Sequence, residues 1–91
     1  QTFKSIILLR TELEHKIISL GKKQALAKSF LQYLYSKPIT DAADVAEALN
    51  INISTTMRLI SDFIKLNILI EVTGFKRNRI FAFDDYLKLF R

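Results

Sequence analysis

The spacing of apolar residues predicts two helices at the start of the chain. Between Phe3 and Leu20, and again from about Gln24 to Ser36, apolar residues recur every three or four positions, as on one face of a helix. Gly21 is expected to end the first helix. Pro38 ends the second, because a proline pushes the residue before it out of helical geometry. Ile39 then leaves room for a very short strand.

The segment from Asp41 to Leu69 predicts two further helices joined by a tight turn. Thr40 is the expected N-cap of the first, since its hydroxyl can accept a hydrogen bond from a first-turn amide. Asn50 is expected to close that helix in the left-handed conformation, and Asn67 to close the second in the same way. Asn52 is the cap that opens the second helix. Together they form a helix-turn-helix unit.

A β-hairpin is predicted after the second of these helices. The segment 68–72 is β-branched and apolar, the segment 79–83 is apolar again, and the two flank a polar loop that contains a glycine. Asp84 is expected to cap a last helix. This order of elements is that of a winged helix-turn-helix domain over residues 38–91, preceded by an N-terminal helical extension over residues 1–37. The predicted fold class is mainly α with a small β-hairpin.

Length and composition narrow the class of protein. Ninety-one residues support one domain, and 49% apolar residues suffice for a folded core. The chain has no cysteine, so it has no disulfide or thiolate metal site. Its apolar runs are far shorter than the ~20 residues of a membrane span, so we expect no membrane and a cytoplasmic location. Gln1 is an unusual natural start, so we expect a piece of a longer protein.

The net charge of +5 is unevenly distributed. Residues 1–37 hold seven Lys or Arg and two Glu, which gives +5. Residues 38–72 hold two basic and five acidic residues, which gives −3, and residues 73–91 hold five basic and two acidic, which gives +3. The overall charge permits a polyanionic partner, but the basic residues lie mostly outside the helix-turn-helix.

The second helix of this unit, over about residues 53–66, is the candidate recognition helix. Side chains of types that contact phosphates and base edges face outward on it. These candidates, for insertion into a DNA major groove, are Ser54, Thr55, Met57, Arg58 and Ser61. The competing interpretation is an outer face that is merely solvated. The local charge of −3 and the exposed apolar Ile53 argue against DNA contact by this helix.

The loop at residues 73–79 is the candidate wing. Its densest cationic group, with an amide beside it, is Lys76, Arg77, Asn78 and Arg79. A wing tip of this kind meets a minor groove or the phosphate backbone. In the alternative interpretation Arg79 pairs with Glu71 across the hairpin, and the other cations are ordinary solvated turn residues.

The chain offers no catalytic or metal-binding constellation. His15 is the only histidine, and no second ligand stands at a suitable spacing from it. No nucleophile paired with a base and no glycine-rich phosphate loop is present. We therefore expect no enzymatic activity, no cofactor and no metal.

The sequence also resembles the C-terminal winged helix-turn-helix region of Fic-family proteins. The segments that carry the resemblance are PIT, ADVAEALN, STTMRLI and NILIEVTGFKRNRIFAFDDYLKLF, preceded by LGKKQALAKSFLQYLYSKPI. The resemblance implies a DNA-binding or regulatory module, with a role in transcription regulation, attached to an enzyme that transfers AMP to protein hydroxyl groups (AMPylation). The family's HPFxxGNGR catalytic loop is absent, so the catalytic domain is expected to precede Gln1 in the same polypeptide.

A different class of function remains open at this level. The apolar arc between Phe3 and Leu20 is wider than one small domain usually covers, and Ile53 is apolar at an exposed position. Both features suit a protein-interaction domain that docks on the Fic catalytic domain, or on a second copy of itself as a homodimer, without binding DNA.

Overall fold

The computed structural model describes residues 2–72 and 79–89, and it confirms a mainly helical fold with a small antiparallel sheet. The elements, in chain order, are α1 (Thr2–Ile18), the short 3₁₀ helix η1 (Gly21–Lys23), α2 (Gln24–Ser36), β1 (Ile39–Asp41), α3 (Ala42–Leu49), α4 (Ile53–Lys65), β2 (Ile70–Glu71), β3 (Ile80–Ala82) and α5 (Asp84–Lys88). The first helix is shorter than predicted, because the chain turns at Ser19 and Leu20.

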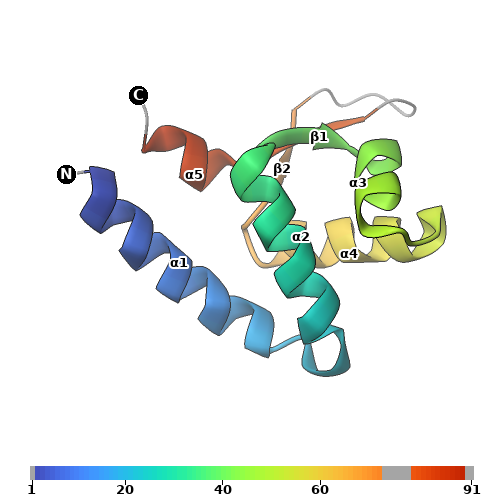
Figure 1. The fold of residues 1–91 in the computed structure, drawn as a ribbon, viewed down its shortest axis with the longest axis horizontal. Helices are drawn as coiled ribbons and strands as arrows, with labels where there is room; N and C mark the ends of the chain where they lie inside the picture. The colour runs from blue at the N-terminus through green and yellow to red at the C-terminus, as the bar shows by residue number, and fades with distance from the viewer. Residues whose placement is uncertain (1, 73–78, 90–91) are drawn as a thin grey trace.

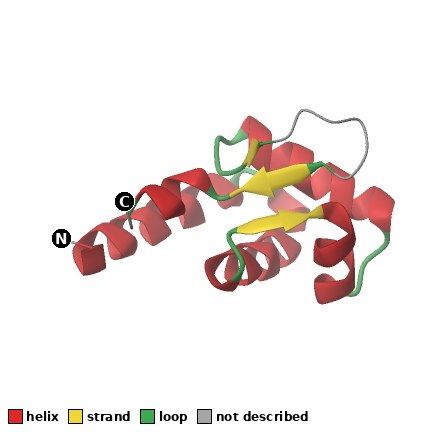
Figure 2. Ribbon diagram, turned by 90° about the horizontal axis from the view of Figure 1, so that it is seen from above, coloured by secondary structure: helices red, strands yellow, loops and turns green. Residues whose placement is uncertain are grey.

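The helices pack around a small three-stranded sheet (Figures 1 and 2). The helices α1 and α2 form a hairpin through η1, and α3 and α4 pack against each other. The predicted β-hairpin is confirmed, since β2 pairs with β3 with Ile70 opposite Ala82. The short strand β1 adds to the other side of β3, with Thr40 opposite Phe81, so the strand order is β1-β3-β2.

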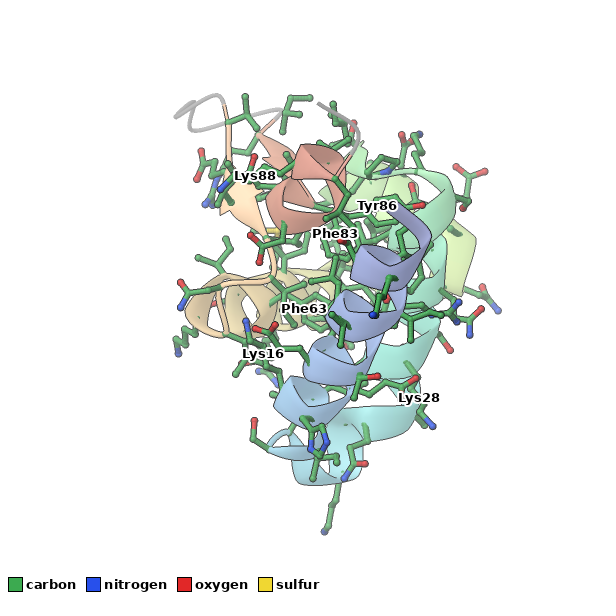
Figure 3. All side chains as sticks on the ribbon, turned by 90° about the vertical axis from the view of Figure 1, so that its left-hand side faces the viewer. Lys16, Lys28, Phe63, Phe83, Tyr86 and Lys88 are labelled. Atoms are coloured by element: carbon green, nitrogen blue, oxygen red, sulfur yellow. The ribbon has the colours of Figure 1, made fainter. Side chains whose placement is uncertain are left out.

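One core joins the N-terminal helices to the helix-turn-helix. The rings of Phe30 in α2 and Phe63 in α4 lie 4.6 Å apart, a distance at which aromatic pairs attract beyond the area they bury. Leu13 and Ile17 place α1 in the same core. Figure 3 shows Phe63 behind α1, whereas Lys28 points away from the body. The wide apolar arc predicted for α1 is therefore covered along its inner side.

Three asparagines set the ends of α3 and α4 as the sequence predicts. Asn50 and Asn67 have positive φ values of 54° and 61°, which only short polar side chains and glycine adopt readily. Asn52 is the N-cap of α4, and its side-chain oxygen accepts a hydrogen bond from the Thr55 amide at 2.7 Å.

Two predicted N-caps are wrong by one residue. Asp41, and not Thr40, caps α3 and accepts from the Asp44 amide at 2.9 Å. The reason is that Thr40 continues β1 and is buried, with its hydroxyl 2.8 Å from that of Tyr33. Phe83, and not Asp84, occupies the cap position of α5.

Within residues 2–72 and 79–89, none of the helices combines the length and the apolar character that crossing a membrane requires.

Candidate nucleic-acid interface

The outward face of α4 carries one straight row of polar and basic side chains. Ser54, Arg58, Ser61 and Lys65 stand four, three and four residues apart, a spacing that aligns side chains along a helix. All four are exposed, while the opposite face is buried against the core. We call these four residues the polar row.

The polar row contains three of the five predicted residues on this helix and one that sequence reasoning missed. Thr55 and Met57 are half-buried and lie outside the row. Lys65 was missed because it stands in the last turn, where a cation also suits the helix dipole. Lys65 follows Ser61 by four residues and Arg58 by seven, and this helical spacing could have placed it on the same face. Ile53 is 52% exposed, as predicted.

Two acidic residues of the helix-turn-helix, Asp62 and Asp44, are paired with cations from elsewhere in the chain. Asp62, which is beside the polar row, accepts from Lys23 of η1 at 3.1 Å. Asp44 accepts from Lys37 at 2.6 Å. The sequence alone does not predict the pair between Lys23 and Asp62, because the two residues are 39 positions apart and nothing local links them. These ion pairs reduce the negative potential that the local charge of −3 implies.

The effect of these pairs is on the electrostatic field and not on stability. The hydrogen bond to Asp44 raises the pKa of Lys37, so this cation stays charged throughout the physiological range. Ion pairs between exposed side chains contribute little to the free energy of folding, because water screens them. These ion pairs do neutralise negative charge near α4, so an approaching polyanion is repelled less.

Arg79 lies at the base of the hairpin and has a structural partner. Its guanidinium donates to the Glu71 carboxylate at 2.5 Å and lies over the Phe81 ring, 5.3 Å from the centroid. The hydrogen bond to Glu71 raises the pKa of Arg79. The predicted pairing of Arg79 with Glu71 is therefore confirmed. The other predicted wing residues, Lys76, Arg77 and Asn78, lie outside the described residues.

A hollow of about 450 Å³ lies between α4 and the start of β3. Its lining is apolar on the α4 side and basic at the rim. The lining residues are Met57, Ile60, Ser61, Ile64, Lys65 and Arg79. We call it the α4–hairpin hollow. Sequence reasoning did not predict it, because it forms only where the hairpin is placed beside α4.

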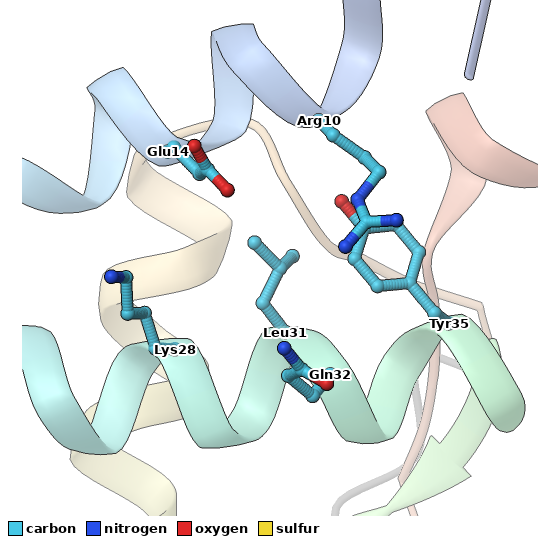
Figure 4. Close-up of a pocket in the computed structure, with 6 residues that line it drawn as sticks. All are labelled: Arg10, Glu14, Lys28, Leu31, Gln32 and Tyr35. Atoms are coloured by element: carbon cyan, nitrogen blue, oxygen red, sulfur yellow. The ribbon is translucent and has the colours of Figure 1, made fainter. Parts of the chain in front are cut away.

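A second, smaller hollow of about 140 Å³ lies between α1 and α2 (Figure 4). It is lined by Arg10, Glu14, Lys28, Leu31, Gln32 and Tyr35. The Arg10 guanidinium lies over the Tyr35 ring at 5.0 Å from the centroid. Burial raises the pKa of the Tyr35 phenol, although the charge of Arg10 acts in the opposite direction. This hollow is separate from the polar row.

Among residues 2–72 and 79–89, no three His, Cys, Asp or Glu side chains gather where they could hold a metal ion. His15 lies exposed on α1. Comparison of the chain with known proteins found no match: no protein-family model, no curated protein and no solved structure matches it.

Replacing Tyr35 by Phe tests the burial of its hydroxyl. That hydroxyl is buried, and although the Arg10 guanidinium lies close to it, the two do not meet hydrogen-bond geometry. Its removal should therefore leave stability at pH 7 within about 1 kcal/mol of wild type. Because the pKa of Tyr35 is raised in the folded state, the unfolded chain ionises first, and wild-type stability should fall as pH rises above 10.0. Tyr35→Phe should lose less stability there, measured by urea unfolding between pH 7 and 11.

Tyr33→Phe is the matched control, since it removes a hydroxyl that does have a partner, Thr40. It should cost about 0.5–1.5 kcal/mol already at pH 7. If Tyr35→Phe lost stability at high pH as steeply as wild type does, the loss could not come from the raised pKa of Tyr35.

Proposed function

We propose that this domain binds duplex DNA with α4 in the major groove. The observation that carries the proposal is the polar row: the second helix of a helix-turn-helix presents hydroxyl groups and cations along one exposed line, beside a carboxylate that Lys23 neutralises. A helix of this diameter fits the major groove of B-DNA, where base edges are distinguishable. No carboxylate belongs to the row itself.

The residues of the polar row take different roles in this arrangement. Arg58 is in the middle of the row, and its guanidinium can donate two hydrogen bonds to the O6 and N7 acceptors of a guanine. Ser54 is in the first turn of α4, where amide groups and the helix dipole favour a phosphate. Lys65, at the other end, suits a phosphate contact that carries no sequence information.

The wing residues have two different roles in this arrangement. Lys76, Arg77 and Asn78 are proposed to reach the phosphate backbone or the minor groove. Arg79 instead stabilises the base of the hairpin through Glu71, so it is not proposed as a DNA contact.

The parent protein is proposed to belong to the Fic family, with this domain as its C-terminal regulatory module. Support comes from the resemblance in the EVTG and KRNR segments together with the winged-helix order of elements. In that case AMP transfer belongs to a catalytic domain elsewhere in the same polypeptide, and this domain has no activity of its own. An HPFxxGNGR loop encoded upstream of Gln1 is the expected finding, and sequencing the gene around this segment tests it. Its absence would leave a winged helix of another family.

A second candidate function is self-association through α1. Three apolar side chains of α1 face away from the core and are 49%, 65% and 57% exposed: Ile7, Leu8 and Ile18. Such residues in one helix suit contact with a second copy or with a neighbouring domain.

Arg58→Ala and Lys65→Ala should each weaken DNA binding. Each removes one phosphate or base contact, so the slope of log K against log salt should become less steep by about 1. Arg58→Ala should also relax the preference for one base pair. Fluorescence anisotropy with duplex DNA at several salt concentrations measures both effects.

Lys28→Ala is the control, since Lys28 is exposed on α2 and has no ion pair among the described residues. It should leave the slope nearly unchanged. Binding that is absent, or that is equally insensitive to all three substitutions, would overturn the placement of α4 in the groove.

For self-association, sedimentation equilibrium at several concentrations should show a dimer that Leu8→Asp converts to a monomer. A buried charge without a partner opposes association strongly. If the wild-type domain is a monomer at every concentration, the homodimer is excluded and only docking on another domain is left.

A further inference from the structure

The α4–hairpin hollow has the size and the lining of a small-molecule site. The hollow is open to solvent on one side, and its volume of about 450 Å³ falls within the roughly 300–1,000 Å³ typical of ligand pockets, which are mostly apolar with a few polar groups that fix orientation. The hollow between α1 and α2 is smaller, at about 140 Å³, and its lining is mostly polar. The α4–hairpin hollow is therefore the stronger candidate.

An apolar flank of α4 forms the floor of this hollow. Met57, Ile60 and Ile64 stand three and four residues apart, so they align beside the polar row. Ile60 is fully buried, whereas Met57 and Ile64 are half-buried and open to the hollow. The hydrocarbon chain of a ligand placed here would cover both side chains. The removal of this apolar surface from water would drive binding.

The rim of the hollow is cationic. Lys65 is exposed and has no ion pair among the described residues. Arg79 is held in place by the Glu71 carboxylate and the Phe81 ring, and its guanidinium has five N–H donors. Ser61 adds a hydroxyl donor. No carboxylate is among the described residues that line the hollow. The charge of Arg79 is balanced by Glu71, so a negatively charged head group meets one unpaired cation, Lys65, together with the Ser61 hydroxyl and the remaining N–H donors of Arg79.

We propose that the α4–hairpin hollow binds a small apolar carboxylate, and that this ligand and DNA exclude each other. The hydrocarbon lies on Met57 and Ile64, and the carboxylate is next to Lys65 and Arg79. Exclusion rests on the proposed DNA-binding function, since Ser61 and Lys65 belong both to the polar row and to the hollow. A ligand that occupies Lys65 removes a phosphate contact and introduces negative charge at the DNA-facing surface.

The first experiment measures ligand binding without DNA. Decanoate, kept below its micelle concentration, is titrated into ¹⁵N-labelled protein, and amide shifts are followed by two-dimensional NMR. Shifts should cluster at Met57, Ser61, Ile64 and Arg79. Decylamine, with the same chain and the opposite charge, and acetate, with the charge but no chain, should produce no saturable shifts at these residues. Equal binding of decylamine, or no saturable shift with decanoate, would overturn the site.

Lys65→Gln should weaken decanoate binding about tenfold, the effect of losing one charge-assisted contact. Lys28→Gln is the matched control and should bind like wild type. Because Lys65 is exposed, its variant is expected to fold, and the NMR spectrum reports that directly. An unchanged affinity in Lys65→Gln would exclude the proposed position of the head group.

The second experiment adds a DNA duplex and separates the two proposals. Decanoate should raise the apparent Kd for DNA in proportion to its occupancy, and decylamine should not. If decanoate binds and DNA does not, the ligand site holds and the proposed DNA-binding function fails. If both bind without competing, mutual exclusion is wrong.

Discussion

The contact between Phe30 and Phe63 decides which face of α4 meets solvent. It joins α2 to α4 inside the core, with the two rings 4.6 Å apart. Once Phe63 points inward, the periodicity of the helix places Arg58 and Lys65 on the outside. The polar row is thus a consequence of core packing, and the N-terminal helices are part of what holds the helix-turn-helix in position.

The same packing changes the electrostatics of the face that it exposes. The short helix η1 brings Lys23 to Asp62, which is beside the polar row. Lys37, next to Pro38, reaches Asp44 at the start of α3. A segment with a formal charge of −3 therefore presents basic residues along the outside of α4. The proposal of DNA binding depends on this distribution more than on the net charge of +5.

The hairpin adds a chemically different surface beside the polar row. Arg79 is fixed by Glu71 and Phe81, and it faces an apolar flank of α4 across the α4–hairpin hollow. A polyanion and an apolar acid would use neighbouring parts of one surface and would share Lys65. Such sharing couples two ligands directly, since neither can bind fully while the other is present.

The sequence by itself determined the elements and most of their ends. Local chemistry was sufficient wherever the signal lies within one turn, as for the left-handed Asn50 and Asn67 and the cap at Asn52. The prediction failed at Thr40, because pairing of β1 with β3, with Thr40 opposite Phe81 far along the chain, carries the strand past Ile39 to Asp41. Tertiary structure alone decided that Lys23 neutralises Asp62 and that Arg79 lies across from the apolar flank of α4. Both depend on distances between segments far apart in the chain, and the spacing of residues along a sequence does not contain those distances.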